Sequence, residues 1–124
     1  MTQEDKELLL KDLCARLPYG VKIQVPYEDG SGYFDETVWE VNNDGPFHVN
    51  GWGIEYEYVK PYLFPLSSMT EEQKEEYQYI TEKWMYDSSY SICDSMDYLN
   101  KNHFDYRGLI EKGIAIDATG LNIY

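Results

Sequence analysis

A chain of 124 residues with 43% hydrophobic side chains can bury one core, so its composition excludes intrinsic disorder. Its net charge of −13 excludes DNA, RNA and anionic membranes as direct partners, because phosphate groups are bound by Lys and Arg. An acid excess of this size favours a protein partner with a basic surface. The thirteen tyrosines suit an interface, since the ring packs while the hydroxyl stays available. The sequence shows neither repeat nor linker, and residues 1–124 are expected to form one globular domain.

The first helix is predicted from Thr2 to Leu17. Thr2 can cap its N-terminus, and acidic side chains fill the first turn, where the helix dipole favours them. Pro18 and Gly20 end the helix. The side chains with the spacing of one buried stripe are Leu9, Leu10, Leu13, Cys14 and Leu17.

A β-sheet follows the first helix. Alternating apolar residues and tight-turn signals predict four strands in series. These strands are Val21–Val25, Phe34–Asn42, Phe47–Val49 and Ile54–Tyr58. Hairpins linked in this way give an antiparallel meander of three to four strands. Lys60–Pro65 contains two prolines and is predicted to be an extended connector that ends the sheet.

The rest of the chain is predicted to be mainly helical. A capping box opens the second helix, and both Ser68 with Glu71 and Thr70 with Gln73 fit it. A third helix is predicted over Tyr90–Lys101.

Beyond the third helix, Asp105 can cap one further helical turn or two, Tyr106–Lys112. Ile114–Ile116 is expected to be an edge strand, and Thr119–Tyr124 to fray. The fold class is therefore α+β, with an N-terminal helix, the meander, and two to three C-terminal helices packed on one sheet face.

Cysteine content and the N-terminal segment bear on the cellular compartment. Cys14 and Cys93 are too few for a disulfide scaffold, and both are expected to be reduced, small core residues. The first seven residues are acidic where a signal peptide is basic, and Leu8–Leu10 is too short for its hydrophobic region. No stretch has the length of a membrane span. We therefore expect a cytoplasmic protein.

The segment between Lys22 and Lys60 has eight carboxylates and no basic residue. Three of these acids are expected on the outer face of the sheet: Glu40, Glu55 and Glu57. Rows of carboxylates can imitate the phosphates of duplex DNA, which makes a DNA-mimic inhibitor of a nucleic-acid-handling protein one hypothesis. The alternative is a solvated acidic surface that only keeps the chain soluble.

Residues 103–108 form the second surface feature. His103 and Asp105 offer two metal ligands, but nothing nearby completes a coordination set, so no metal site is predicted. Arg107 among so many acids predicts a structural ion pair that locks the last helix to the sheet. The alternative is an interaction site composed of His103, Asp105, Tyr106 and Arg107.

An enzyme is the hypothesis of another class. Glu55 and Glu57 point the same way from one predicted strand, about 7 Å apart, near the separation that glycosidases use. Cys14 has no histidine beside it in sequence, and the glycines lie in hairpins rather than in a phosphate-binding loop. No catalytic residue or cofactor is assigned. A small hydrolase or small-ligand-binding protein that uses Glu55, Glu57 or His103 remains the alternative.

Three blocks, Leu8–Val21, Lys60–Thr70 and Asn102–Gly113, together resemble a family of short, uncharacterised bacterial proteins found in gut anaerobes, often near phage-derived or mobile elements. Tyr27–Val59 departs most from that pattern. The family has no established activity, cofactor or catalytic residues, so the resemblance transfers none. It implies a bacterial cytoplasmic setting and favours a phage- or defence-related interaction protein, of open oligomeric state.

Overall fold

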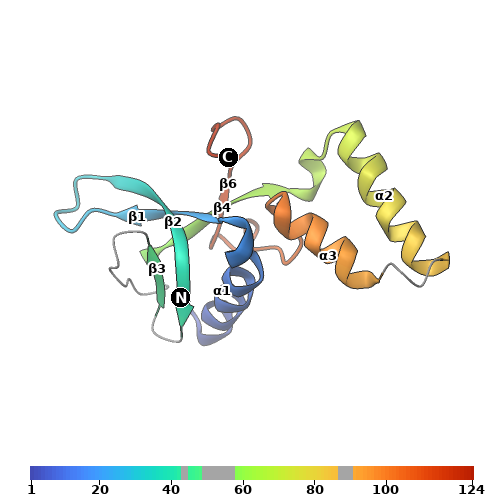
Figure 1. Ribbon diagram of the computed structural model, residues 1–124. Helices are drawn as coiled ribbons and strands as arrows, with labels where there is room; N and C mark the ends of the chain where they lie inside the picture. Colours follow the sequence, from blue (N-terminus) through green and yellow to red (C-terminus); the bar gives the residue numbers. More distant parts are fainter. Residues whose placement is uncertain (43–44, 49–57, 87–90) are drawn as a thin grey trace.

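The computed structural model describes residues 1–42, 45–48, 58–86 and 91–124. These residues confirm the α+β class (Figure 1). They form a six-stranded sheet in the order β3-β2-β1-β4-β5, with β6 paired to β4. The sheet is mixed rather than antiparallel, because β5 and β6 both run parallel to β4.

Helix α1 covers Gln3–Arg16, as the capping signal predicts. The Thr2 hydroxyl oxygen accepts a hydrogen bond from the Asp5 N–H at 3.1 Å. After a 3₁₀ turn that contains Pro18, Gly20 adopts φ +74°, a left-handed conformation that ends the helical segment. One part of the predicted stripe is wrong: Cys14 is exposed, and Cys93 is exposed as well.

Strands β1 (Lys22–Pro26), β2 (Tyr33–Asn42) and β3 (Gly45–His48) form the expected antiparallel hairpins. Every second side chain of β1 is buried, which confirms the predicted alternation of apolar and polar residues in this strand. The fourth predicted strand, Ile54–Tyr58, lies almost entirely outside the described residues.

Lys60–Pro65 does not end the sheet; it is strand β4, which pairs with β1, β5 and β6. The prolines occupy the second and last positions of the strand, where a missing N–H costs least. Between them the backbone is bonded: Phe64 N–H donates to the His103 carbonyl at 2.8 Å, and the Leu63 carbonyl accepts from Ala118 at 2.8 Å.

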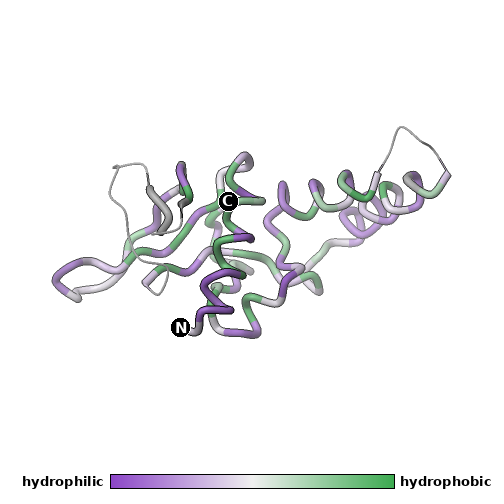
Figure 2. The backbone as a smooth tube through the Cα atoms, turned by 90° about the horizontal axis from the view of Figure 1, so that it is seen from below, coloured by the Kyte–Doolittle hydropathy of each residue, from purple (hydrophilic) through white to green (hydrophobic). Residues whose placement is uncertain are grey.

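Helices α2 (Glu71–Tyr86) and α3 (Ile92–Lys101) confirm two C-terminal helices. Of the two capping frames, α2 uses Thr70 with Gln73: each backbone N–H donates to the other side chain, at 2.9 and 3.1 Å. The two helices run side by side away from the sheet in both views (Figures 1 and 2). At its C-terminal end α3 packs near β5 and α1.

Where one or two helical turns are predicted over Tyr106–Lys112, the structure has no helix; it has turns from Leu109 onward, with one helix-like bond from the Lys112 N–H to the Gly108 carbonyl at 3.2 Å. Asp105 nevertheless caps this segment, accepting from the N–H groups of Leu109 and Ile110 at 3.0 and 2.9 Å. Asp105 itself belongs to β5 (Phe104–Asp105), and Ile116 opens β6 (Ile116–Asp117). The chain end does not fray: the Tyr124 hydroxyl donates to the Tyr62 carbonyl at 2.7 Å.

The core lies between α1 and the sheet. Its members are fully or almost fully buried apolar side chains from α1, β1, β2, β4 and the turns after β5. They include Leu9, Leu13, Val21, Ile23, Val25, Val38, Leu63, Leu109 and Ile114. This layer leaves α2 outside the core, and its main packing partner among the described elements is α3.

Candidate functional site

A fully buried ion pair joins α1 to the C-terminal part of the sheet. Asp12 and Arg16 are both 0% exposed, and Arg16 Nε donates to Asp12 Oδ2 at 2.8 Å. A second bond from Arg16 Nη2 to Asp12 Oδ1 measures 3.2 Å, and the same nitrogen donates to the Phe104 carbonyl at 2.6 Å. The guanidinium therefore ties one turn of α1 to strand β5.

Tyr106 and Arg107 extend this pair into a cluster. Two guanidinium groups contact the Tyr106 ring, with Arg16 Cζ 5.2 Å and Arg107 Cζ 4.7 Å from its centroid. Arg107 Nη1 is 3.9 Å from Asp12 Oδ1, which is the ion pair expected for Arg107, although its partner lies on α1 rather than on the sheet. The Tyr106 hydroxyl donates to Asn100 Oδ1 at 2.8 Å and so reaches α3.

These contacts give Asp105, Tyr106 and Arg107 a structural role. Asp105 caps the turn that follows it, and the other two residues join α1 to α3. The cluster therefore connects α1, β5 and α3. Removing one partner of its buried ion pair would leave the other charge without compensation. The Asp105 carboxylate and the Arg107 guanidinium both contact other parts of the fold, and the interaction-site hypothesis for these residues stays a prediction.

His103 directly precedes β5 and differs from its neighbours. It is 8% exposed, and its φ of +62° is left-handed, a conformation that costs a non-glycine residue about 1 kcal/mol or more. Its ring stacks on Tyr124, with centroids 3.6 Å apart and planes 9° from parallel. Among the described residues, no group bonds to its buried Nδ1.

The imidazole of His103 is neutral at physiological pH. Burial is the main cause that lowers its pKa from 6.5 to about 4, and the positive charges of Arg16 and Lys22 contribute to the same shift. A neutral ring has one nitrogen that donates and one that accepts, so it can bond to a ligand of either kind.

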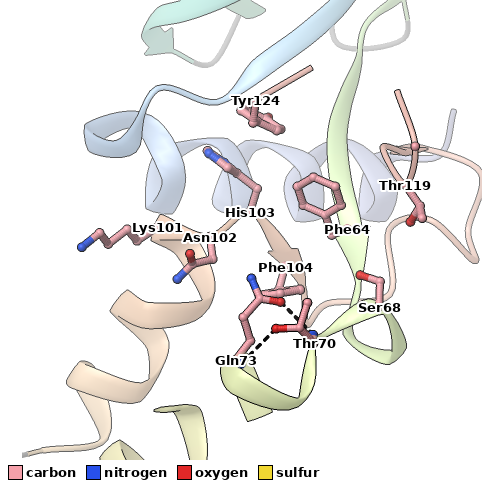
Figure 3. A pocket seen from close by; sticks show the side chains of 11 residues that line it. Phe64, Ser68, Thr70, Gln73, Lys101, Asn102, His103, Phe104, Thr119 and Tyr124 are labelled. Carbon is pink, nitrogen blue, oxygen red and sulfur yellow. Dashed lines mark hydrogen bonds between the residues drawn. The ribbon is translucent and has the colours of Figure 1, made fainter. Parts of the chain in front are cut away.

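A pocket of about 520 Å³ opens beside His103 (Figure 3). Aromatic rings form part of its wall, namely Phe64, Phe104 and Tyr124. The remaining lining is polar and comes from the start of α2, the end of α3 and the loop after β6. These residues are Ser68, Thr70, Gln73, Lys101, Asn102, Thr119 and Gly120. The volume lies within the range of small-molecule sites.

A second hollow, of about 420 Å³, lies between α2 and α3. Its lining consists of Glu75, Glu76, Tyr79, Ile80 and Tyr98. Burial, with Glu76 nearby, raises the pKa of Tyr98 to about 12, and the phenol donates to Glu76 Oε2 at 2.8 Å. We call this hollow the α2–α3 groove.

The helices around the α2–α3 groove expose apolar and acidic side chains together. Tyr79, Met85 and Ile92 are each more than half exposed, and Tyr86 is 86% exposed. Hydrophobic and hydrophilic stretches alternate along both helices (Figure 2). The exposed acids of α2 are Glu71, Glu72, Glu75, Glu76 and Glu82. Helix α2 thus presents apolar area under a negative field, away from the sheet.

The acidic sheet face is only partly described. Glu40 is exposed on β2, whereas Glu55 and Glu57 lie outside the described residues. Within the described ranges, no three His, Cys, Asp or Glu side chains gather as metal ligands. No described helix is both long and apolar enough to cross a membrane.

Sequence reasoning missed the charged pair inside the core. Leu9, Asp12, Leu13 and Arg16 follow the i, i+3, i+4, i+7 spacing of a buried helical stripe, and this spacing was the available signal. Because two of these four positions carry charged residues, the all-apolar stripe that includes Leu10, Cys14 and Leu17 was predicted to be the buried one. The pocket residues carried no such signal, because Phe64, Gln73, His103 and Tyr124 come from four separate segments.

Comparison of the chain with protein-family models, curated proteins and solved structures gives no match.

Proposed function

We propose that this protein is a non-enzymatic interaction domain whose α2–α3 groove binds a basic amphipathic helix of a partner protein. The observation that supports the proposal is the groove itself, in which Tyr79, Ile80 and Tyr98 lie beside the carboxylates of Glu75 and Glu76. A helix that lays its apolar face into such a groove brings its flanking cations next to these acids.

The position of α2 supports the same occupant. Two packed helices leave an exposed groove that a third helix can fill, as in a bundle. Tyr86 and Ile92, exposed at the far end of the two helices, would extend the apolar contact. The net charge of −13 adds long-range attraction for a cationic partner and repels nucleic acid. Both cysteines are free, which fits the reducing cytoplasm as the setting.

A synthetic amphipathic helix of Leu and Lys tests this proposal by fluorescence anisotropy. Replacing Glu75 and Glu76 together by Gln keeps both side-chain shapes and removes two charges. We expect binding to weaken about fivefold, since two exposed ion pairs of about 0.5 kcal/mol each contribute about 1 kcal/mol together. Binding should also weaken as salt is added, because added ions screen exposed charges.

The matched control replaces Glu28 and Glu111 by Gln, two exposed acids far from the α2–α3 groove in sequence. This variant has the same net charge as the Glu75/Glu76 double variant, but it should bind the peptide as tightly as the wild type does. Equal weakening of both double variants would mean that only net charge attracts the peptide, and the groove would then have no role. A Leu/Glu peptide of the same pattern should not bind.

A sharper variant of the function is a DNA-mimic inhibitor, acting on the basic groove of a nucleic-acid-handling protein. The exposure of Glu40 on β2 supports it. It expects duplex DNA to compete for the partner, and the complex to be lost when Glu40, Glu55 and Glu57 become Gln. Undiminished binding by that triple variant would exclude it.

A further inference from the structure

We propose that the pocket beside His103 is a binding site for a small aromatic carboxylate, distinct from the α2–α3 groove. The two hollows share no lining residue. The ligand's ring would lie among Phe64, Phe104 and Tyr124, and its carboxylate would face the N-terminal end of α2.

The first argument is the charge of the lining. The chain has 23 acidic residues against 10 basic ones, yet none of the described residues that line this pocket is acidic, and the charged one among them is Lys101. Lys101 is exposed and extends along the edge of the pocket away from the rings (Figure 3). Glu71 and Glu72, which follow the cap of α2, are exposed and are not part of the lining. The described pocket wall therefore carries no negative charge that would repel an anion, and the nearby acids Glu71 and Glu72 lie outside it.

The second argument is a hydrogen-bond donor held in place. Gln73 Oε1 accepts from the Thr70 N–H at 2.9 Å, which fixes the orientation of the carboxamide. Its nitrogen consequently points to the side of Asn102 and His103 (Figure 3). This donor lies in the first turn of a 16-residue helix, whose dipole is positive at that end. Donors fixed in this way match the oxygens of a carboxylate.

The third argument is His103 itself. His103 is 8% exposed, its backbone is left-handed at φ +62°, and its Nδ1 has no partner among the described residues. Both the strained backbone and the unpaired nitrogen lower the stability of the fold. Strained backbone and unpaired polar atoms gather at ligand sites, where binding uses them. The stacked pair of His103 and Tyr124 offers a flat, polar-edged wall beside which an aromatic ring packs.

The test uses four probes of similar size and the NMR signals of the His103 ring. Benzoate should shift these signals in a saturable way, at millimolar concentration. Benzylamine, which carries the opposite charge, should not bind. Benzamide and cyclohexanecarboxylate, which lack the charge or the aromatic ring, should each bind more weakly than benzoate. Tighter binding of benzylamine, or no saturable shift with benzoate, would overturn the proposal.

A variant locates the carboxylate. Gln73→Glu replaces the amide donor by a carboxylate, and Glu serves equally well at this position of a capping box, so α2 keeps its start. Benzoate should bind about tenfold more weakly to this variant, because one charge-assisted hydrogen bond is lost. Gln78→Glu makes the same charge change at an exposed position of α2 and should bind benzoate within about twofold of the wild type. Equal weakening by the two variants would contradict the site.

Discussion

At the scale of single residues, the charged side chains inside the fold are the least expected feature. Asp12 and Arg16 occupy core positions of α1 that apolar residues usually take. Arg16 contacts the backbone of Phe104 and the ring of Tyr106, so the pair links α1 to residues 88 and 90 positions after Arg16. The stability that this pair contributes depends on the geometry of its hydrogen bonds as well as on the surface area that it buries.

We predict that Asp12→Asn lowers the free energy of unfolding by about 3–5 kcal/mol, because it leaves the buried Arg16 guanidinium uncompensated. Lys74→Gln is the matched control, since it breaks the exposed ion pair with Glu71 and should cost at most about 1 kcal/mol. Urea unfolding of both variants measures the difference. Similar small losses in the two variants would show that the cluster does not hold the elements together.

His103 gives a prediction about pH. Burial lowers its pKa to about 4 in the folded chain, against 6.5 in the unfolded chain, so the unfolded state binds more protons between these values. Stability from this group is therefore complete above pH 6.5 and falls by about 3 kcal/mol as the pH is lowered to 4.

His103→Asn separates this loss from the titration of the carboxylates. Asparagine tolerates the left-handed backbone that position 103 requires, and it does not titrate. Urea unfolding at pH 7 and at pH 4 should show a smaller loss of stability on acidification in the variant than in the wild type. An identical loss in both proteins would mean that His103 protonates freely while folded.

At the scale of elements, local signals predicted helices better than strands. The caps at Thr2 and Thr70 act within four residues, so the sequence contains everything that they need. Lys60–Pro65 was assigned wrongly because a strand is defined by its neighbours, and β5 and β6 come from residues about 40 or more positions later. The turns after Asp105 were assigned wrongly for another reason. The cap that usually begins a helix is present there, but no helix follows it.

The start of α2 offers a test at this scale. Thr70→Ala removes the oxygen that accepts the Gln73 N–H and should cost about 1 kcal/mol. Thr70→Ser keeps that oxygen and should stay within a few tenths of a kcal/mol of the wild type. Thermal unfolding of both variants checks the difference. Equal losses would mean that the methyl group of Thr70, and not the cap, stabilises this helix.

At the scale of the whole molecule, composition indicates a kind of partner but does not say which part of the fold would bind it. The net charge and the thirteen tyrosines pointed to a basic protein partner, and the sheet face around Glu40 was the expected place. The described residues offer α2 and α3 instead, where acids lie beside exposed apolar side chains. The α2–α3 groove depends on how two helices pack, and the pocket beside His103 depends on four chain segments. Neither arrangement is encoded within one stretch of sequence.

The most direct test of the central proposal is an NMR map of where the basic amphipathic peptide binds. The account predicts that signals of Tyr79, Ile80 and Tyr98 shift as the peptide is added, and that those of Glu40 on β2 do not. Shifts centred on Glu40, or small shifts spread evenly over the acidic surface, would contradict binding in the α2–α3 groove.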